Sequence, residues 1–355
     1  MDHCRITTML TANWSQYATE SRRLERIHFR RSVPIACRAP DRRRGAAGAP
    51  NRAFWSHVPI QFELPEARWE GVMRIAVTGA SGQVGSQVVR LLAGEQAHQV
   101  VALSRRVLPS GRWPAGVSAC AADYADLDAL STALRGADTL VFVSSDGPVA
   151  QVMVHHHNVI RAARASGVAH IVALSGLDAD PCSPFCYAVS YGYTERLLAG
   201  SGCLVSIARA SIYSEFFIGF LARARASGQV RLPAADGRIS LVSRADVARC
   251  LAALAVRPAG GRHDITGPES LDLAAASALA AREWGTALEY VRITPAEHCA
   301  EMANAGEDPW WMYAYSTMFA SIREQRWAAV SDEVRRLTGC LPVSVRTTLA
   351  SGKTA

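Results

Sequence analysis

Short apolar runs alternate with amphipathic stretches from residue 73 to residue 210. Strands are predicted at 75–77, 99–104, 117–121, 139–144, 170–175 and 203–209. Helices are predicted between them, one carrying Val84, Val88, Leu91 and Leu92, and three more at 126–134, 152–165 and 187–198. Strands and helices that alternate at this spacing predict an α/β fold built on a doubly wound parallel sheet.

The pattern is less regular from residue 211 to residue 355. Helices are predicted at 212–226, 243–255 and 271–283, with several more near the C-terminus, and short strands at 230–232, 238–242, 263–265 and 288–293. The sequence Ser243-Arg-Ala-Asp246 has the pattern of a capping box that opens one of these helices. We interpret 211–355 as mostly a smaller α+β lobe that binds substrate, with 239–256 returning to the first domain, 73–210.

The most informative local motif is the glycine-rich turn between the first predicted strand and the helix that follows it. This order suits a dinucleotide, because N–H groups at the helix N-terminus bind its pyrophosphate. Gly79 permits the sharp turn, Gly82 the approach of the backbone to phosphate, and Gly85 the packing of helix on strand. An ordinary glycine turn is the alternative. The cofactor-binding residues predicted from this turn and from the end of the strand at 139–144 are Gly79, Ser81, Gly82, Gln83, Val84, Gly85, Val143 and Ser144.

The end of the second strand indicates which dinucleotide is bound. An acidic side chain there binds the ribose 2′-hydroxyl of NAD, whereas this strand ends in Ser104-Arg105-Arg106. Arginine pairs well with phosphate oxygens, so Ser104 and Arg105 predict NADP(H). Two solvated arginines at a strand end are the alternative. Asp123 and Tyr124 follow the third strand and are placed to contact adenine, although Asp123 is also an ordinary turn residue.

Composition narrows the class of protein. Of the 355 residues 49% are hydrophobic, and no apolar run reaches the length of about 18 residues that a membrane span needs. The 9 cysteines are scattered and odd in number, which favours reduced thiols in a cytoplasmic protein. Residues 73–355 are nearly neutral, so the net charge of +7 does not indicate nucleic-acid binding. We expect a small-molecule substrate and no membrane or nucleic-acid partner; a monomer and a homodimer both stay open.

The first 72 residues do not look like part of this domain. They show no sustained helical or strand period and carry 12 arginines and 7 acidic residues. We expect this Arg-rich extension, 1–72, to be disordered or not native, with Met73 as an alternative start. Deleting residues 1–72 tests this expectation, which a loss of folded, NADP-binding protein contradicts.

In its motifs the chain resembles the atypical short-chain dehydrogenases of the NmrA-like family. It is most similar to the branch that contains NADPH quinone reductase and triphenylmethane reductase. The motifs that carry the resemblance, in chain order, are 78–85, 140–145, 157–168, 171–176, 194–202, 236–246 and 330–339. The resemblance covers about residues 73–350 and implies a Rossmann-type fold and an oxidoreductase that uses NADP(H).

One departure from the wider short-chain family bears on catalysis. A typical member carries a Tyr-x-x-x-Lys pair, in which the ammonium lowers the tyrosine pKa. The matching positions here are Tyr187 and Tyr191, and the chain's single lysine is Lys353. A tyrosine without that help keeps a pKa near 10 and is a poor base at neutral pH. We predict that Tyr187, with Ser175 at the end of the fifth strand, polarises a substrate carbonyl by hydrogen bonding.

Aromatic residues beside these positions are candidates for an apolar substrate pocket. The predicted lining residues are Phe185, Tyr191, Tyr213 and Phe216; Phe217, Trp310 and Trp311 are further candidates. Core packing is the alternative for each of them. Consecutive histidines at 155–157 point to different faces of a helix and predict no metal site. Asn158 is placed either near the nicotinamide or as ordinary helix polarity.

Together these features predict an NADPH-dependent oxidoreductase that transfers hydride to a quinone, an enone or an iminium-like acceptor. The missing lysine keeps open a non-catalytic NADP(H) sensor of the NmrA-like kind. A tailoring reductase of secondary metabolism is the third reading. NADPH oxidation against a panel of acceptors separates the sensor from the two enzymes.

Overall fold

The computed structural model describes residues 71–106 and 111–352. The predicted extension 1–72 therefore lies outside the described residues except for its last two. Lys353 lies outside them as well.

A seven-stranded sheet forms the centre of the described chain, in the order β3-β2-β1-β4-β5-β6-β9. Every neighbouring pair in it is parallel. Its strands are β1 (Arg74–Val77), β2 (Gln99–Ser104), β3 (Ser118–Ala121), β4 (Thr139–Phe142), β5 (His170–Gly176), β6 (Leu204–Ala210) and β9 (Gly261–Ile265). The predicted doubly wound sheet is confirmed, and the continuous apolar runs of β4 and β5 are buried throughout, as parallel strands covered on both faces require.

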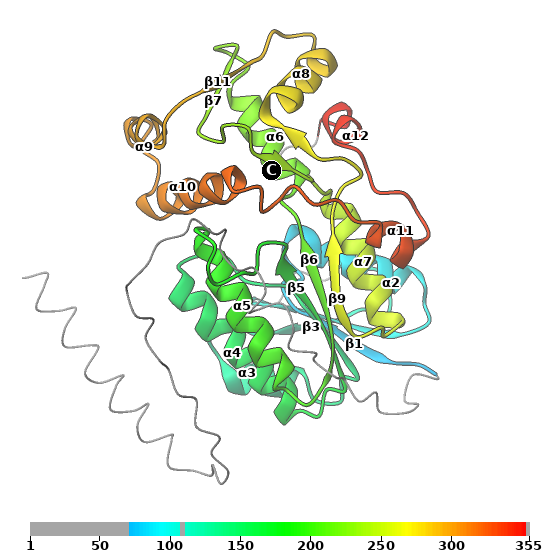
Figure 1. Ribbon diagram of the computed structural model, residues 1–355. Coiled ribbons are helices and arrows are strands. Elements are labelled where there is room, and N and C mark those ends of the chain that lie inside the picture. The colour runs from blue at the N-terminus through cyan, green and yellow to red at the C-terminus, as the bar shows by residue number, and fades with distance from the viewer. Residues whose placement is uncertain (1–70, 107–110, 353–355) are drawn as a thin grey trace, which may run out of the picture. The chain divides into compact units, whose positions relative to one another are not determined.

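Helices cover both faces of this sheet (Figure 1). One layer holds α2 (Gln83–Gly94), α7 (Arg244–Val256) and α11 (Glu333–Thr338); the other holds α3 (Leu127–Ala133), α4 (Val149–Ala165) and α5 (Cys186–Ala199). The apolar stripe predicted on α2 faces inward, because Val84, Val88 and Leu92 are buried against the sheet whereas Leu91 is exposed.

A second hydrophobic core lies beyond the ends of β5 and β6, in the upper part of Figure 1. It is built by α6 (Ser214–Arg223), α8 (Leu273–Trp284), α10 (Pro309–Arg323) and α12 (Val345–Ala350), together with the first turn of α5. The helix α9 (Pro295–Asn304) packs beside α10. Two small sheets join them: β7 (Gln229–Leu232) pairs with β11 (Glu289–Arg292), and β8 (Arg238–Ile239) with β10 (Leu271–Asp272). Among the described helices, none is both long enough and apolar enough to cross a bilayer.

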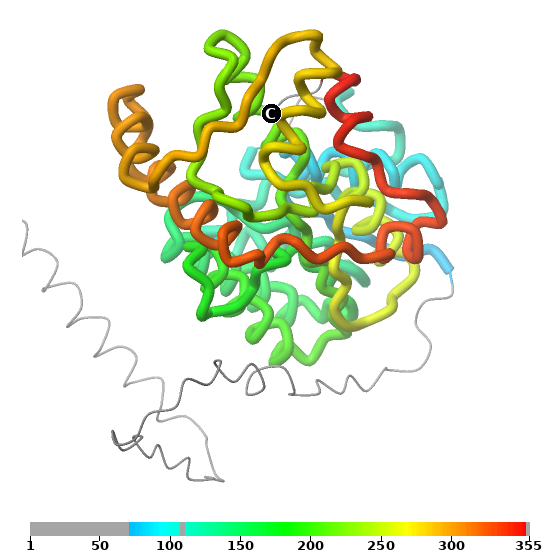
Figure 2. The backbone as a smooth tube through the Cα atoms, turned by 45° about the horizontal axis from the view of Figure 1, so that its top comes forward, coloured from blue at the N-terminus to red at the C-terminus, as the bar shows by residue number. Residues whose placement is uncertain are grey.

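The chain returns to the first domain differently from the predicted segment, 239–256. The return begins later, since β8 pairs with β10 of the second lobe, and α7 begins at Arg244 behind its N-cap Ser243. It also extends further, because β9 adds the last strand to the main sheet and α11 packs beside α7. Figure 2 shows the chain after α10 crossing to α11 before it reaches α12 next to α8.

Candidate cofactor and substrate site

A cavity of about 680 Å³ opens at the carboxyl ends of the parallel strands. It lies where the strand order reverses between β1 and β4, the position at which open α/β sheets bind ligands. Eighteen of the residues predicted from the sequence line it: Gly79, Ser81, Gly82, Gln83, Val84, Gly85, Ser104, Arg105, Asp123, Tyr124, Val143, Ser144, Ser175, Phe185, Tyr187, Tyr191, Tyr213 and Phe216. The structure thus brings two predicted groups, one for a dinucleotide and one for a substrate, to a single cavity.

The glycine turn is packed so tightly that side chains are excluded. Gly79 has a φ of +61°, in the left-handed region that favours glycine. A Cβ on Gly85 would lie 2.3 Å from the carbonyl oxygen of Gly79, so the helix meets the turn there without room for one carbon. The N-terminus of α2, capped by Gly82, has no side-chain cap and no acidic residue in its first turn. Its N–H groups therefore face the cavity, where they fit a pyrophosphate.

The end of β2 presents the features expected for a 2′-phosphate. Arg105 is exposed on the cavity wall and forms no ion pair with any described residue. Ser104 is buried, and its hydroxyl donates to the carbonyl of Arg106 over 2.6 Å, which ties together the backbone on both sides of Arg105. The residues present therefore fit NADP(H).

Asp123 and Tyr124, which follow β3, form hydrogen bonds with the protein backbone. Asp123 accepts the N–H of Ala125 over 2.9 Å, the ordinary turn role, while it also lines the cavity. The Tyr124 hydroxyl donates to the carbonyl of Val143 over 2.7 Å and so fastens β4 to this turn. Asn158 does not line the cavity; its amide donates to the carbonyl of Tyr124 over 3.0 Å.

The three consecutive histidines go to three different places, as helix geometry predicts. His155 lines the cavity, and burial lowers its pKa, so its ring is neutral near pH 7. His156 is fully buried with its pKa lowered to about 3, and its ring bonds the N–H of Ser145 at 3.2 Å and Thr194 at 2.7 Å. His157 lies beside Tyr193. No three potential metal ligands gather anywhere in the described part of the chain.

The hydroxyls of the predicted pair, Tyr187 and Ser175, are engaged by the protein itself. Tyr187 donates to the carbonyl of Gly147 over 3.1 Å and accepts the N–H of the same residue over 3.0 Å. The Ser175 hydroxyl donates a hydrogen bond to the carboxylate of Glu195 over 2.9 Å, and Glu195 in turn forms an ion pair with Arg209. Both side chains line the cavity, but neither has a free proton to offer a substrate. This differs from the prediction, because the partners come from segments distant in the sequence.

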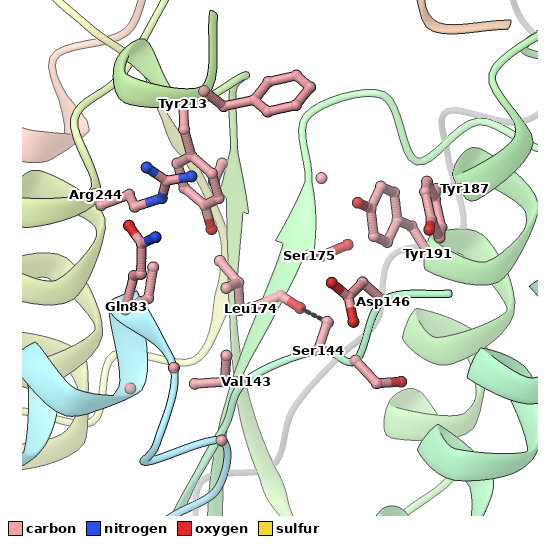
Figure 3. A pocket seen from close by; sticks show the side chains of 18 of the residues that line it. Gln83, Val143, Ser144, Asp146, Leu174, Ser175, Tyr187, Tyr191, Tyr213 and Arg244 are labelled. Atoms are coloured by element: carbon pink, nitrogen blue, oxygen red, sulfur yellow. Dashed lines mark hydrogen bonds between the residues drawn. The ribbon is translucent and has the colours of Figure 1, made fainter. Parts of the chain in front are cut away.

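Two other tyrosines present free hydroxyls to the cavity. Tyr191 comes from the first half of α5 and points toward Ser175 (Figure 3). A Cβ on Gly176 would lie 2.3 Å from the Tyr191 ring, so the glycine makes room for that ring against β5. None of the hydrogen bonds among the described residues involves the hydroxyl of Tyr191 or of Tyr213. Burial raises the pKa of both, so both stay protonated donors.

Aromatic side chains form the far end of the cavity. Phe185 and Phe216 line it as predicted, and so does Trp311. Phe217 is instead fully buried in the second core, and Trp310 packs edge-on against Tyr187 outside the lining. Further lining residues from the end of α10 and beyond are Ala314, Tyr315, Met318 and Trp327.

Several polar lining residues were not predicted from the sequence, namely Ser145, Asp146, Gln151, His155, Ser211 and Arg244. Asp146 and Gln151 flank the start of α4, and Arg244 is the first residue of α7. The signal available was their position just after β4 or at a helix start, since such positions face the carboxyl edge of the sheet. Arg244 was not predicted as a cavity residue because α7 follows a long segment that belongs to the second lobe.

Comparison with known proteins agrees with this geometry. Residues 79–258 match a family model described as NAD(P)H-binding. Quinone oxidoreductase 2 of Escherichia coli (strain K12) is 34% identical over 237 residues, which cover 65% of this chain and 82% of that protein. The NAD(P)H azoreductase of Xenophilus azovorans is 28% identical over 268 residues, 75% of this chain and 93% of that protein.

A solved structure is similar over the same region. The NADPH-dependent quinone oxidoreductase QOR2 from Escherichia coli, complexed with NADPH, has a TM-score of 0.73 and 28% identity. It covers 78% of this chain and 99% of that one. These matches confirm the predicted branch of reductases, and they confirm a nicotinamide dinucleotide as the cofactor.

Proposed function

The chain belongs to the NAD(P)H-binding, NmrA-like family of oxidoreductases, and from this premise we propose that it transfers hydride from NADPH to a conjugated or aromatic acceptor. Quinones are the first acceptor class to consider, because a relative of this chain is named a quinone oxidoreductase. Azo compounds are a second class, from the name of the azoreductase. We propose a reducing compartment such as the cytoplasm for this activity, because the scattered, odd-numbered cysteines are typical of proteins with reduced thiols.

The observation that carries the proposal is the continuity of the cavity. One end holds the glycine turn and Arg105, and the other is walled by Phe185, Phe216 and Trp311. A flat, apolar acceptor would stack among these rings, which hold it next to the dinucleotide.

Different parts of the chain would bind different groups of the dinucleotide. The N-terminus of α2 would hold the pyrophosphate and Arg105 the 2′-phosphate. When bound, NADPH supplies the hydride. The protein supplies position and a polar environment for the charge that develops on the acceptor oxygen.

We assign the hydrogen bond to the acceptor to Tyr191. Its hydroxyl is free, protonated and directed into the cavity from the position that a lysine occupies in typical short-chain dehydrogenases. Tyr187 is a positioning residue, because its two bonds to Gly147 hold the loop after β4 against α5. The reduced acceptor takes its proton from solvent, since no described residue beside Tyr191 has an ammonium that would lower its pKa.

The proposal is tested by NADPH oxidation against naphthoquinones, azo dyes, triphenylmethane dyes and enones. We expect turnover with at least one class, and faster turnover with NADPH than with NADH. Tight NADPH binding without oxidation on every acceptor would instead favour the NADP(H) sensor.

Replacing Tyr191 with phenylalanine is expected to lower kcat with little change in the KM for NADPH. Loss of one neutral hydrogen bond corresponds to about 0.5–1.5 kcal/mol, so the decrease is severalfold rather than complete. Because burial raises the pKa of Tyr191, the wild-type rate should not fall through its ionisation below about pH 9.

Tyr193→Phe is the matched control, since Tyr193 lies on the same helix but outside the cavity lining. It should behave like the wild type. Equal kcat values for Tyr191→Phe and the wild type would remove Tyr191 from the mechanism.

A further inference from the structure

Arg244 is a cation in the cavity wall that has no counter-ion among the described residues. It forms no ion pair with any described residue, and its Nη1 atom is buried without a hydrogen-bond partner. A guanidinium loses hydration when it is enclosed in this way, which is costly unless an acceptor replaces the water. The cavity is the place from which that acceptor can come, since Arg244 lines it.

Tyr213 contacts the side chain of Arg244, and Glu215 holds its backbone. Its guanidinium lies over the ring of Tyr213, 5.1 Å from the centroid, in a cation–π contact. Both carboxylate oxygens of Glu215 accept the backbone N–H of Arg244 at 3.1 Å, which anchors the first turn of α7. Glu215 thus binds the backbone of Arg244 and forms no ion pair with its guanidinium. The arginine is positioned before any ligand arrives.

The two walls of the cavity differ in charge. Arg244, Gln83 and Tyr213 lie on the wall made by α2, α6 and α7, and Asp146, Tyr187 and Tyr191 lie on the other (Figure 3). Asp146 is exposed and, like Arg244, forms no ion pair within the described residues. An acceptor with one anionic group would therefore be oriented with that group toward Arg244 and away from Asp146.

We propose that Arg244 is a specificity-determining residue that binds a carboxylate or sulfonate carried by the acceptor. The inference rests on the proposed function and adds a substrate class to it, namely anionic aromatic acceptors. In the proposed function the phosphates of the dinucleotide would have other partners, the N-terminus of α2 and Arg105. Arg244 instead lies over the ring of Tyr213, and Tyr213 precedes Phe216 of the aromatic wall by three residues at the start of α6.

The test compares naphthoquinone with naphthoquinone sulfonate in the wild type and in Arg244→Gln. We expect the wild type to favour the sulfonate in kcat/KM, and the variant to lose this preference by roughly tenfold or more, as for a charge-assisted hydrogen bond. Arg244→Lys should restore part of it. The KM for NADPH should stay within about twofold of the wild type in both variants.

Arg225→Gln is the matched control, because Arg225 also lies over an aromatic ring, Trp284, but is exposed and outside the cavity. It should keep the wild-type preference. Equal use of both quinones by the wild type would overturn the proposal. So would a rise in the KM for NADPH in Arg244→Gln that is the same with either quinone, since Arg244 would then bind the cofactor.

A binding measurement separates this proposal from the proposed function. Naphthalene sulfonate and naphthalene methanol are titrated into the NADP⁺ complex of the wild type, with the fluorescence of Trp311 and Trp327 in the cavity wall as the signal. We expect tighter binding of the sulfonate and a loss of that difference in Arg244→Gln. If no quinone is reduced, the proposed hydride transfer fails, while this titration still supports or refutes the anion site.

Discussion

NADPH binding is expected to weaken strongly when Gly85 is replaced by alanine. The added Cβ would lie 2.3 Å from the carbonyl oxygen and 2.7 Å from the carbonyl carbon of Gly79, and backbone atoms of a tight turn cannot move aside as a flexible side chain does. Forced overpacking costs about 1–3 kcal/mol, which corresponds to a factor of about five to more than one hundred in the dissociation constant. Calorimetric titration of NADPH, together with the melting temperature, measures the effect.

Gly94 offers a matched control at the other end of the same helix. It is exposed, and nothing lies within 4 Å of a Cβ built on it. Gly94→Ala should therefore bind NADPH as the wild type does and melt at the same temperature or slightly higher, because alanine favours the helix by about 0.5–1 kcal/mol. Wild-type affinity in Gly85→Ala would show that the turn is not the pyrophosphate site.

Selectivity for NADPH over NADH is expected to collapse when Arg105 is replaced by glutamine. A charge-assisted bond to phosphate is worth about 1.5–3 kcal/mol, so kcat/KM for NADPH should fall by more than tenfold. The value for NADH should stay the same, since it has no 2′-phosphate. The loss should be smaller at high salt, because Arg105 is exposed and its charge is screened.

The neighbouring Arg106 provides the control for charge alone. It is exposed like Arg105 but does not line the cavity. Arg106→Gln should leave the ratio of NADPH to NADH activity unchanged. If both variants lost the same part of the preference for NADPH, the arginines would act only through the positive electrostatic potential at this edge of the sheet. Neither would then bind the 2′-phosphate directly.

The sheet and the dinucleotide turn were predictable because their causes are local. The buried strands β4 and β5 have continuous apolar runs, and most of the buried positions of α2 are apolar. The turn is indicated by three glycines at a fixed spacing in the sequence. Parallel strands then bring Gly79, Ser104 and Val143 to one edge of the sheet, so the predicted cofactor residues come together.

The direction of the return into the first domain was predicted, but its extent was not. Residues 238–242 have the composition of one longer strand, yet β8 has two residues and Val242 instead bridges to Tyr213. The strand that does join the sheet, β9, carries the exposed polar residues Arg262 and Asp264. An edge strand has this mixed pattern because solvent reaches part of it, so its sequence is a weak signal.

The amino-acid sequence by itself determined the fold class, the dinucleotide turn, the arginine at the end of β2 and the lack of a lysine four residues after Tyr187. Each depends on residues close together in the chain. The tertiary structure alone decided which polar groups are free to act. The hydroxyl of Tyr187 donates to the carbonyl of Gly147, and the hydroxyl of Ser175 donates to the carboxylate of Glu195. Among the described residues, the Tyr191 hydroxyl and the Arg244 guanidinium have no hydrogen-bond partner and reach the cavity. Hydrogen bonds between distant segments make these assignments, and no local pattern of residues encodes them.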